Sequence, residues 1–117
     1  MQIWTRRIYD DPGPQDGRRI LVDRLWPRGI AKAEARIDAW LKDLAPSDDL
    51  RRWFGHDPAR RDAFRQRYFA ELDQAGEAMT QLRDWAGQGR ITLVYAARDR
   101  AHNNAIALRD YLRARDD

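Results

Sequence analysis

Two short stretches of the 117-residue chain bring together side chains that could do chemistry, and both follow an apolar run. The first is Asp23 to Gly29, and the second covers residues 95 to 104. Both contain arginine, whose guanidinium donates paired hydrogen bonds to phosphate and carboxylate groups. Each also holds a second kind of group, an indole ring in the first stretch and a histidine in the second. This combination predicts a site for an anionic small molecule.

The candidate ligand-binding residues of the first stretch are Arg24, Trp26 and Arg28. The two arginines would hold the anion, and Trp26 would form a wall of the pocket. Asp23 lies beside these cations, and opposite charges keep a carboxyl group ionised and depress its pKa. We therefore assign Asp23 to a structural ion pair with Arg24 or Arg98 in preference to a catalytic role.

In the second stretch, a polar loop leads into the start of a helix, where backbone N–H groups and the helix dipole attract anions. Arg98 and Asn103 are the candidate ligand-binding residues here, and His102 is the candidate for proton transfer. Asp99 is expected to form a structural ion pair. The alternative is that Asp99 only caps the helix and that His102 is an ordinary surface residue.

These stretches need a sheet to position them, and apolar patterns predict three strands, over residues 2 to 8, 18 to 25 and 91 to 95. Pro27 cannot donate to a ladder, so the second strand must end near Leu25. The first two strands could pair as an antiparallel hairpin across the intervening Pro-Gly loop, or lie in a parallel sheet. Ligands of open α/β sheets bind beyond the carboxyl ends of strands, which is where both stretches lie.

Helical patterns fill the segments between the strands, and residues 31 to 36 and 102 to 113 are the first and last of them. Ser47 is a suitable cap for a helix that ends at Gly55, and Asp57 caps the next one. Residues 37 to 44 fit a helix and a strand equally by spacing. The predicted fold is a small α/β sandwich of two or three layers, with a short, mostly parallel sheet of roughly three to four strands and about four to five helices.

The composition limits the classes of function. Residues 1–117 are the size of one domain. Of the 22 basic residues, 20 are arginines, but acidic residues are interspersed with them, so nucleic acid is disfavoured as a partner. No segment has the roughly 20 apolar residues of a membrane span, and the first residues lack a long apolar core, so we expect a cytosolic protein with no membrane contact. The oligomeric state is not indicated.

The absence of cysteine excludes thiolate metal sites and cysteine nucleophiles. The two histidines, His56 and His102, have no partner at ligand spacing, so no metal ion is predicted. The sequence has neither a glycine-rich phosphate loop nor a nucleophile elbow, and it indicates no cofactor. His56 follows Trp53 and Phe54, which either stack on a planar ligand or anchor their loop on the core, and its own role stays open.

Four motifs resemble the YeaO-like branch of the family known as domain of unknown function 488. They are LVDRLWPRG at 21 to 29, WLKDLAPS at 40 to 47, WFGHDP at 53 to 58 and TLVYAARDRAHNNA at 92 to 105. The resemblance implies no particular reaction. It places Ala101 where longer members carry a cysteine, so thiol chemistry is not expected. It also implies that residues 37 to 44 are extended or irregular, which would bring Lys42 to the same pocket as a further ligand-binding candidate.

The leading hypothesis is a cytosolic domain that binds an anionic small molecule, such as a nucleotide or sugar phosphate, and whether it is an enzyme stays open. One alternative is a nucleic-acid-binding or regulatory module, motivated by a pI of about 9.7. The other is a partner-binding protein that uses an exposed patch of Trp40, Trp53 or Trp85.

Overall fold

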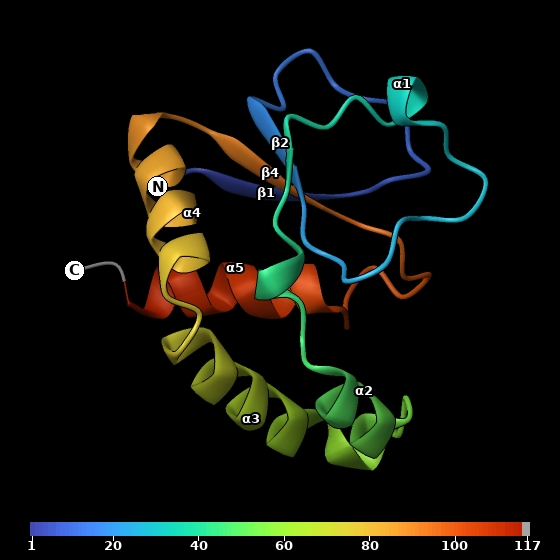
Figure 1. Ribbon diagram of the computed structural model, residues 1–117, viewed down its shortest axis with the longest axis vertical. Coiled ribbons are helices and arrows are strands. Elements are labelled where there is room, and N and C mark those ends of the chain that lie inside the picture. The colour runs from blue at the N-terminus through green and yellow to red at the C-terminus, as the bar shows by residue number, and fades with distance from the viewer. Residues whose placement is uncertain (116–117) are drawn as a thin grey trace.

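The computed structural model describes residues 1–115, which form a four-stranded sheet and five α-helices (Figure 1). The strands are β1 (Ile3–Arg7), β2 (Arg18–Leu21), β3 (Ala39–Trp40) and β4 (Ile91–Tyr95). The helices are α1 (Lys32–Ala35), α2 (Asp48–Phe54), α3 (Arg61–Asp73), α4 (Glu77–Gln88) and α5 (Asn104–Ala114), with 3₁₀ turns η1 (Lys42–Leu44) and η2 (Pro58–Arg60) before α2 and α3. The predicted α/β class is confirmed.

The strand order is β1-β4-β2-β3, and all three strand pairs are parallel. Ile91 of β4 lies opposite both Ile3 of β1 and Arg18 of β2. All five residues of β4 are buried, as expected for a central strand of a parallel sheet. A hairpin of the first two strands is therefore wrong, because β4 separates them.

Strand β2 is shorter than predicted, since it ends at Leu21 and not near Leu25. The Val22 amide still donates to the Val94 carbonyl at 3.1 Å. A continued parallel ladder would next join the Ala96 amide to the Val22 carbonyl. Instead, the Asp23 side chain accepts from the Ala96 amide at 2.8 Å. A side-chain acceptor thus replaces the ladder bond and ends the strand before Pro27 is reached.

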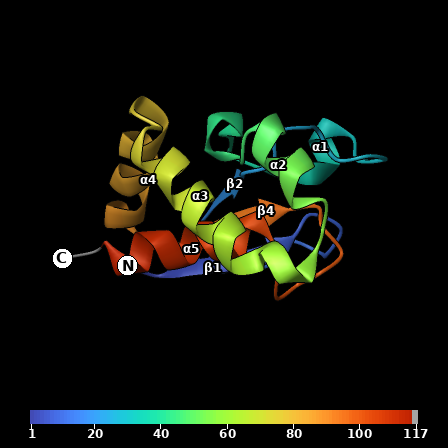
Figure 2. The ribbon, with the colours of Figure 1, turned by 90° about the horizontal axis from the view of Figure 1, so that it is seen from below.

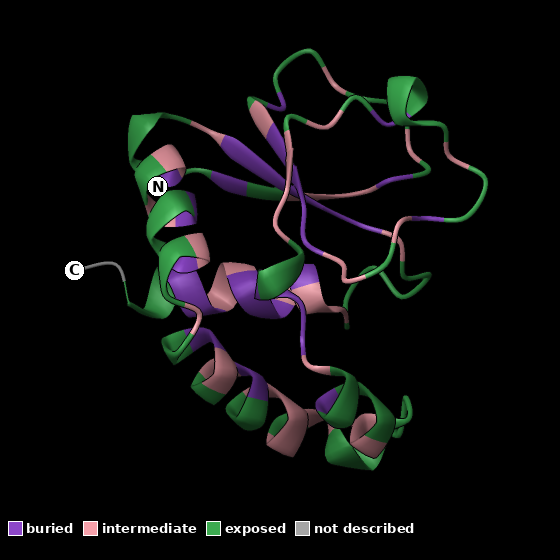
Figure 3. Cartoon of the chain, viewed as in Figure 1, coloured by how far each residue is buried: buried purple, intermediate pink, exposed green. Residues whose placement is uncertain are grey.

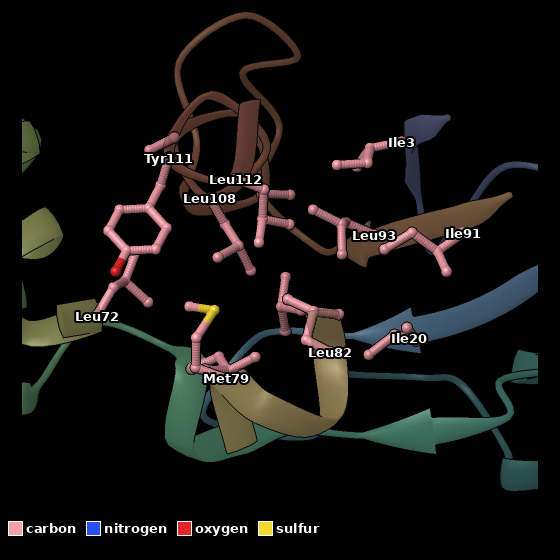
Figure 4. Packing of buried hydrophobic residues seen from close by; sticks show 14 of the residues in the cluster. Ile3, Ile20, Leu72, Met79, Leu82, Ile91, Leu93, Leu108, Tyr111 and Leu112 are labelled. Carbon is pink, nitrogen blue, oxygen red and sulfur yellow. The ribbon is translucent and has the colours of Figure 1, made fainter. Parts of the chain in front are cut away.

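The sheet buries apolar residues on both faces. On one face, Ile20 and Leu93 belong to the main core with residues of α3, α4 and α5. Figure 4 shows Leu108 of α5 and Leu82 of α4 pointing into this core. The other face holds a smaller cluster, in which Leu21 and Val94 contact α1 and residues 26 to 40. Figure 3 shows the buried residues concentrated in the strands and on the inner sides of α4 and α5.

A buried ion-pair network fastens the loop between β1 and β2 to the sheet. The side chain of Asp16 is 1% exposed and lies 2.6 Å from Arg19 and 3.0 Å from Arg6. Burial alone would raise the pKa of Asp16, but the Gly13 amide and the two arginines bring it below its ordinary value. The Asp16 carbonyl accepts from the Thr92 hydroxyl at 2.7 Å. The loop is therefore tied directly to the central strand.

The predicted helix boundaries at Ser47, Gly55 and Asp57 are confirmed. The Ser47 hydroxyl accepts from the Leu50 amide at 3.1 Å, and Asp57 accepts from the Ala59 amide at 3.0 Å. Residues 37 to 44 contain the short strand β3 and then the 3₁₀ turn η1, which agrees with the extended or irregular segment that the resemblance implied and not with a continuous helix. Within residues 1–115, no helix has the length and apolar character to cross a membrane.

Candidate functional site

Strands β2 and β4 end side by side at the carboxyl edge of the sheet, close to the first residue of α5 (Figure 1). The hydrogen bond from the Ala96 amide to Asp23 joins the two exits. The Asn104 side chain, at the start of α5, donates to the Val22 carbonyl at 2.8 Å. These bonds bring the two predicted stretches together at one point. We call the group Asp23, Ala96, Arg98 and Asn104 the carboxyl-edge site.

Asp23 has an environment that differs from the expected one. Burial raises the pKa of its carboxyl group, and this outweighs the Ala96 amide, the Asn104 side chain and the charge of Arg51, which lower it. The pKa of Asp23 is thus raised, whereas the sequence predicted that neighbouring arginines would lower it. Among the described residues 1–115, Asp23 forms no ion pair. The site therefore contains a half-buried carboxyl group that has no ion-pair partner among the described residues, although the charge of Arg51 acts on it.

Arg24 lies close to Asp23 in sequence but turns toward α2. Its Nε is 3.4 Å from the Pro46 carbonyl and 3.7 Å from the Asp48 carboxylate. Arg51 also pairs with Asp48, at 3.1 Å. Two arginines therefore share one carboxylate beside the site, which leaves positive charge at this rim. The sequence could not indicate this, because it does not show where α2 lies.

Tyr68 of α3 is a further residue whose hydroxyl senses the charge of Asp23, and no sequence motif singled it out. Its hydroxyl donates to the Leu44 carbonyl at 2.6 Å, and the residue is fully buried. Burial raises the pKa of Tyr68, and the nearby charge of Asp23 raises it further. Tyr68 is therefore a neutral residue whose hydroxyl binds a backbone carbonyl. Asn104 was also missed, although its place at a helix start beside a strand exit was visible in the sequence.

The loop between β4 and α5 is organised by Asp99. One oxygen of its carboxylate accepts from the Ala101 and His102 amides, both at 2.9 Å, and these two bonds lower the pKa of Asp99. The other oxygen lies 3.2 Å from His102 Nδ1 and 3.7 Å from the Arg61 guanidinium of α3. Asp99 therefore both caps the loop and contacts two basic side chains.

His102 and Asn103 have their polar atoms engaged within the protein. His102 Nε2 lies 3.4 Å from the Arg61 guanidinium, and His102 Nδ1 lies 3.2 Å from the Asp99 carboxylate. The Asn103 side-chain oxygen caps α5 by accepting from the Ile106 amide at 2.9 Å. Its side-chain NH₂ donates to the Asp99 carbonyl at 2.9 Å. These contacts stabilise the loop.

Three of the predicted cations have no acidic partner within residues 1–115. They are Arg28, Lys42 and Arg98, and all three are exposed. The Lys42 ammonium lies 5.1 Å from the centre of the Trp40 ring. In contrast, Arg100 in the same loop as Arg98 binds both oxygens of Asp10, at 2.7 and 2.9 Å. Arg98 lies two positions after Ala96, whose amide donates to Asp23, and its guanidinium has no partner within the described residues.

Trp26 lies in the smaller cluster on the other face of the sheet, edge to face with Trp40 at 5.5 Å. Its indole N–H donates to the Ile30 carbonyl at 2.7 Å. The structure thus places Trp26 among core contacts and not beside Tyr68. Trp40, Trp53 and Trp85 are each half-buried against a core cluster, so these three form no exposed patch.

Similar proteins come from distant bacteria. The chain is 44% identical to the uncharacterized protein Rv3073c of Mycobacterium tuberculosis H37Rv over 114 residues, which cover 97% of this chain and 96% of that protein. It is 42% identical to the uncharacterized protein YeaO of Escherichia coli K12, again over 114 residues, with 97% and 99% covered. No solved structure matches the chain.

The family comparison extends over nearly the whole sequence. A family model described as the inactive DUF488-N3 subclade matches residues 2–117. The YeaO-like resemblance predicted from four motifs is thereby confirmed. Because this model covers residues 2–117, the chain belongs to the inactive DUF488-N3 subclade.

Proposed function

We propose that the protein binds a small molecule that carries both hydroxyl groups and a phosphate or carboxylate group, and that it binds this molecule at the carboxyl-edge site without transforming it. A sugar phosphate or a nucleotide has this chemistry. The observation that carries the proposal is Asp23, a half-buried carboxyl group without an ion pair in the described chain. Such groups lower stability and are concentrated at functional sites.

Asp23 and Asn104 would bind the hydroxyl groups of the ligand. A carboxylate accepts hydrogen bonds, and a protonated carboxyl group also donates one, so either form can engage a hydroxyl. Asn104 adds a side-chain oxygen that accepts no hydrogen bond from residues 1–115. Both side chains are fixed by backbone contacts at 2.8 Å, which reduces the conformational entropy lost on binding.

Arg98 would bind the anionic group. Its guanidinium has no partner within the described residues and lies two positions after Ala96, whose amide contacts Asp23. Arg24 and Arg51 add positive charge on the side of α2, because they share Asp48. The ligand would therefore lie with its hydroxyl groups over the strand ends and its anionic group toward the loop.

A binding role is favoured over catalysis by two observations. Both ring nitrogens of His102, the candidate for proton transfer, already contact Asp99 and Arg61. The family description, an inactive subclade, agrees with a chain that has lost an activity. His102 would then hold the loop that carries Arg98 in place.

A thermal-shift comparison of ribose 5-phosphate, ribose and inorganic phosphate tests the proposal. Ribose 5-phosphate should raise the melting temperature of the wild type most, because it alone of the three has both sugar hydroxyl groups and a phosphate. A ligand at 100 times its Kd stabilises the folded state by about 2.7 kcal/mol. The Arg98→Ala variant should lose the advantage of ribose 5-phosphate over ribose. Asp23→Ala should lose its advantage over inorganic phosphate.

Arg52→Ala provides the matched control, since its side chain is 76% exposed on α2 and pairs loosely with Asp49 at 3.9 Å. This variant should respond to all three compounds as the wild type does. Equal stabilisation of the wild type and Arg98→Ala by ribose 5-phosphate would remove Arg98 from the site and contradict the proposal.

A further inference from the structure

A further group of contacts lies beside the carboxyl-edge site, where β1 leaves the sheet. Arg7, the last residue of β1, donates from its Nε to the Ala97 carbonyl at 3.0 Å. Ala97 directly follows Ala96, whose amide contacts Asp23. Figure 2 shows the segments after β1 and β4 close together at the end of the sheet that lies away from the N-terminus. The exit of β1 therefore adjoins the proposed ligand-binding site.

Tyr9 is the aromatic residue at this exit, and two contacts hold its ring in place. The Arg7 guanidinium lies over the ring at 4.6 Å from the ring centre. The Tyr9 hydroxyl donates to the Arg28 carbonyl, in the loop after β2, at 2.9 Å. Tyr9 thus contacts the exits of β1 and β2 directly, and Arg7 connects it to the exit of β4.

The Tyr9 side chain is exposed although it is fixed. The residue is 42% accessible, and it is one of four exposed large hydrophobic residues within residues 1–115. A side chain that is already held in one conformation loses little entropy when a ligand covers it. An aromatic ring of this kind is suited to stacking on another planar group.

The cations beside Tyr9 have no carboxylate partner in the described chain. Neither Arg7 nor Arg98, which lies in the loop that Arg7 contacts, forms an ion pair with a carboxylate of residues 1–115. Asp10, the next residue along the chain, binds Arg100 through both of its oxygens, at 2.7 and 2.9 Å. These surroundings favour a planar group that is joined to an anionic one.

We propose that the ligand of the carboxyl-edge site is a mononucleotide whose base stacks on the Tyr9 ring. The inference rests on the proposed function, in which Asp23 and Asn104 bind the hydroxyl groups and Arg98 binds the phosphate. Tyr9 adds a planar binding surface that a sugar phosphate would leave unused. The residues that contact Asp23 and Arg7 are consecutive, with Cα atoms about 3.8 Å apart, so a short chain of direct contacts joins the two parts of the site.

A purely structural role of Tyr9 would give a different result. If the ring only fastens the loops after β1 and β2, its replacement lowers the stability of the protein. The relative affinities for a nucleotide and for its sugar phosphate then stay the same. The ratio of these two affinities is therefore the quantity that separates the two roles.

The test compares adenosine 5′-monophosphate (AMP) with ribose 5-phosphate by isothermal titration calorimetry. AMP should bind the wild type about tenfold more tightly, the gain expected when one base stacks on an aromatic ring. Tyr9→Leu should remove this gain and leave the affinity for ribose 5-phosphate unchanged. Tyr9→Phe keeps the ring and removes only the hydrogen bond to Arg28, so it should retain most of the preference for AMP.

Trp4→Leu is the matched control. Trp4 is another exposed ring of β1, with 37% accessibility, and Arg90 stacks on it at 4.0 Å from the ring centre. It lies toward the amino end of the strand, away from the carboxyl-edge site. This variant should bind AMP and ribose 5-phosphate as the wild type does.

The outcomes separate this inference from the proposed function. Equal affinities of the wild type for AMP and ribose 5-phosphate, or an AMP preference that survives in Tyr9→Leu, would overturn the inference and leave the proposed function standing. Failure of the wild type to bind either compound would overturn both. Tighter binding of a short oligoadenylate than of AMP would overturn the choice of a mononucleotide.

Discussion

At the scale of single residues, Asp23 shows how a change of surroundings reverses the behaviour of a carboxyl group. Its sequence neighbours suggested arginine partners, but Arg24 contacts Pro46 and Asp48 instead. Asp23 keeps the Ala96 amide and the Asn104 side chain as hydrogen-bond donors, while burial raises the pKa of its carboxyl group. The type and position of Asp23 were readable from the sequence. Its partners were not, because they depend on the direction in which Arg24 turns.

Asp23→Asn should stabilise the protein at pH 7. The pKa of Asp23 in the folded state lies above the value of about 3.9 expected in the unfolded state, so the wild type loses stability as pH rises between these two values. Asparagine keeps an acceptor for the Ala96 amide and carries no charge. The gain should reach up to about 1 kcal/mol at pH 7 and disappear near pH 3, as measured by urea denaturation at both pH values.

Asp10→Asn is the control, because it should lower the stability of the protein at pH 7 where Asp23→Asn raises it. The hydrogen bond from Arg100 lowers the pKa of Asp10, so this carboxylate stabilises the folded state above its unfolded pKa and loses its effect as pH falls. The pair is partly exposed, and the variant should lose less than about 1 kcal/mol at pH 7. If both variants shifted stability in the same direction at pH 7, our account of Asp23 would fail.

At the scale of elements, the turn before β2 depends on a close approach of two backbones. Gly17 has a φ of 67°, and a Cβ at this position would lie 2.1 Å from the Arg90 carbonyl oxygen. Gly29 has a similar φ of 75°, but a Cβ there would meet nothing within 4 Å. The two glycines therefore share the same backbone strain and differ only in the space around them.

Gly17→Ala should destabilise the protein by about 3 kcal/mol, because it adds a clash with the start of β4 to the strain of a positive φ. Gly29→Ala should lose only about 1 kcal/mol, from strain alone. Urea denaturation of the two variants measures the difference. Equal losses would show that the turn can move away from β4.

The elements themselves were largely predictable, but their arrangement was not. The uninterrupted apolar run of β4 and the caps at Ser47 and Asp57 are local signals, and the structure follows them. The partner strands of β1 and β2 are not determined locally. The Pro-Gly loop between them permits either a hairpin or a connection that leaves room for another strand. In the structure the buried Asp16 and Arg19 join this loop to β4 and to α1, and the sequence does not show these contacts.

At the scale of the whole molecule, the helices contribute unequally to the core. Figure 1 shows α4 and α5 beside the sheet, with α2 and the start of α3 farther from it. Leu50 is the one buried residue of α2, whereas α5 buries five residues. Aromatic contacts such as Phe54 on Phe64, at 4.5 Å, hold α2 mainly to α3. The segment from α2 to the start of α3 is therefore less firmly anchored than the rest.

Hydrogen exchange should show this difference. The amides of α2 should exchange through local opening at a free energy clearly below that of global unfolding, because little apolar surface is exposed when α2 detaches. The amides of β4, which is buried along its whole length, should exchange only on global unfolding. Equal protection of α2 and β4 would show that the two form one cooperative unit.

The central place of β4 has a consequence for the order in which the protein is made. The strand begins at residue 91, yet it is the one that both β1 and β2 pair with. Until residues 91 to 95 have been translated, β1 lacks its partner strand, and β2 has only β3 to pair with. The four-stranded sheet can therefore form only after residues 91 to 95 leave the ribosome, and until then the apolar side chains of the earlier strands stay exposed.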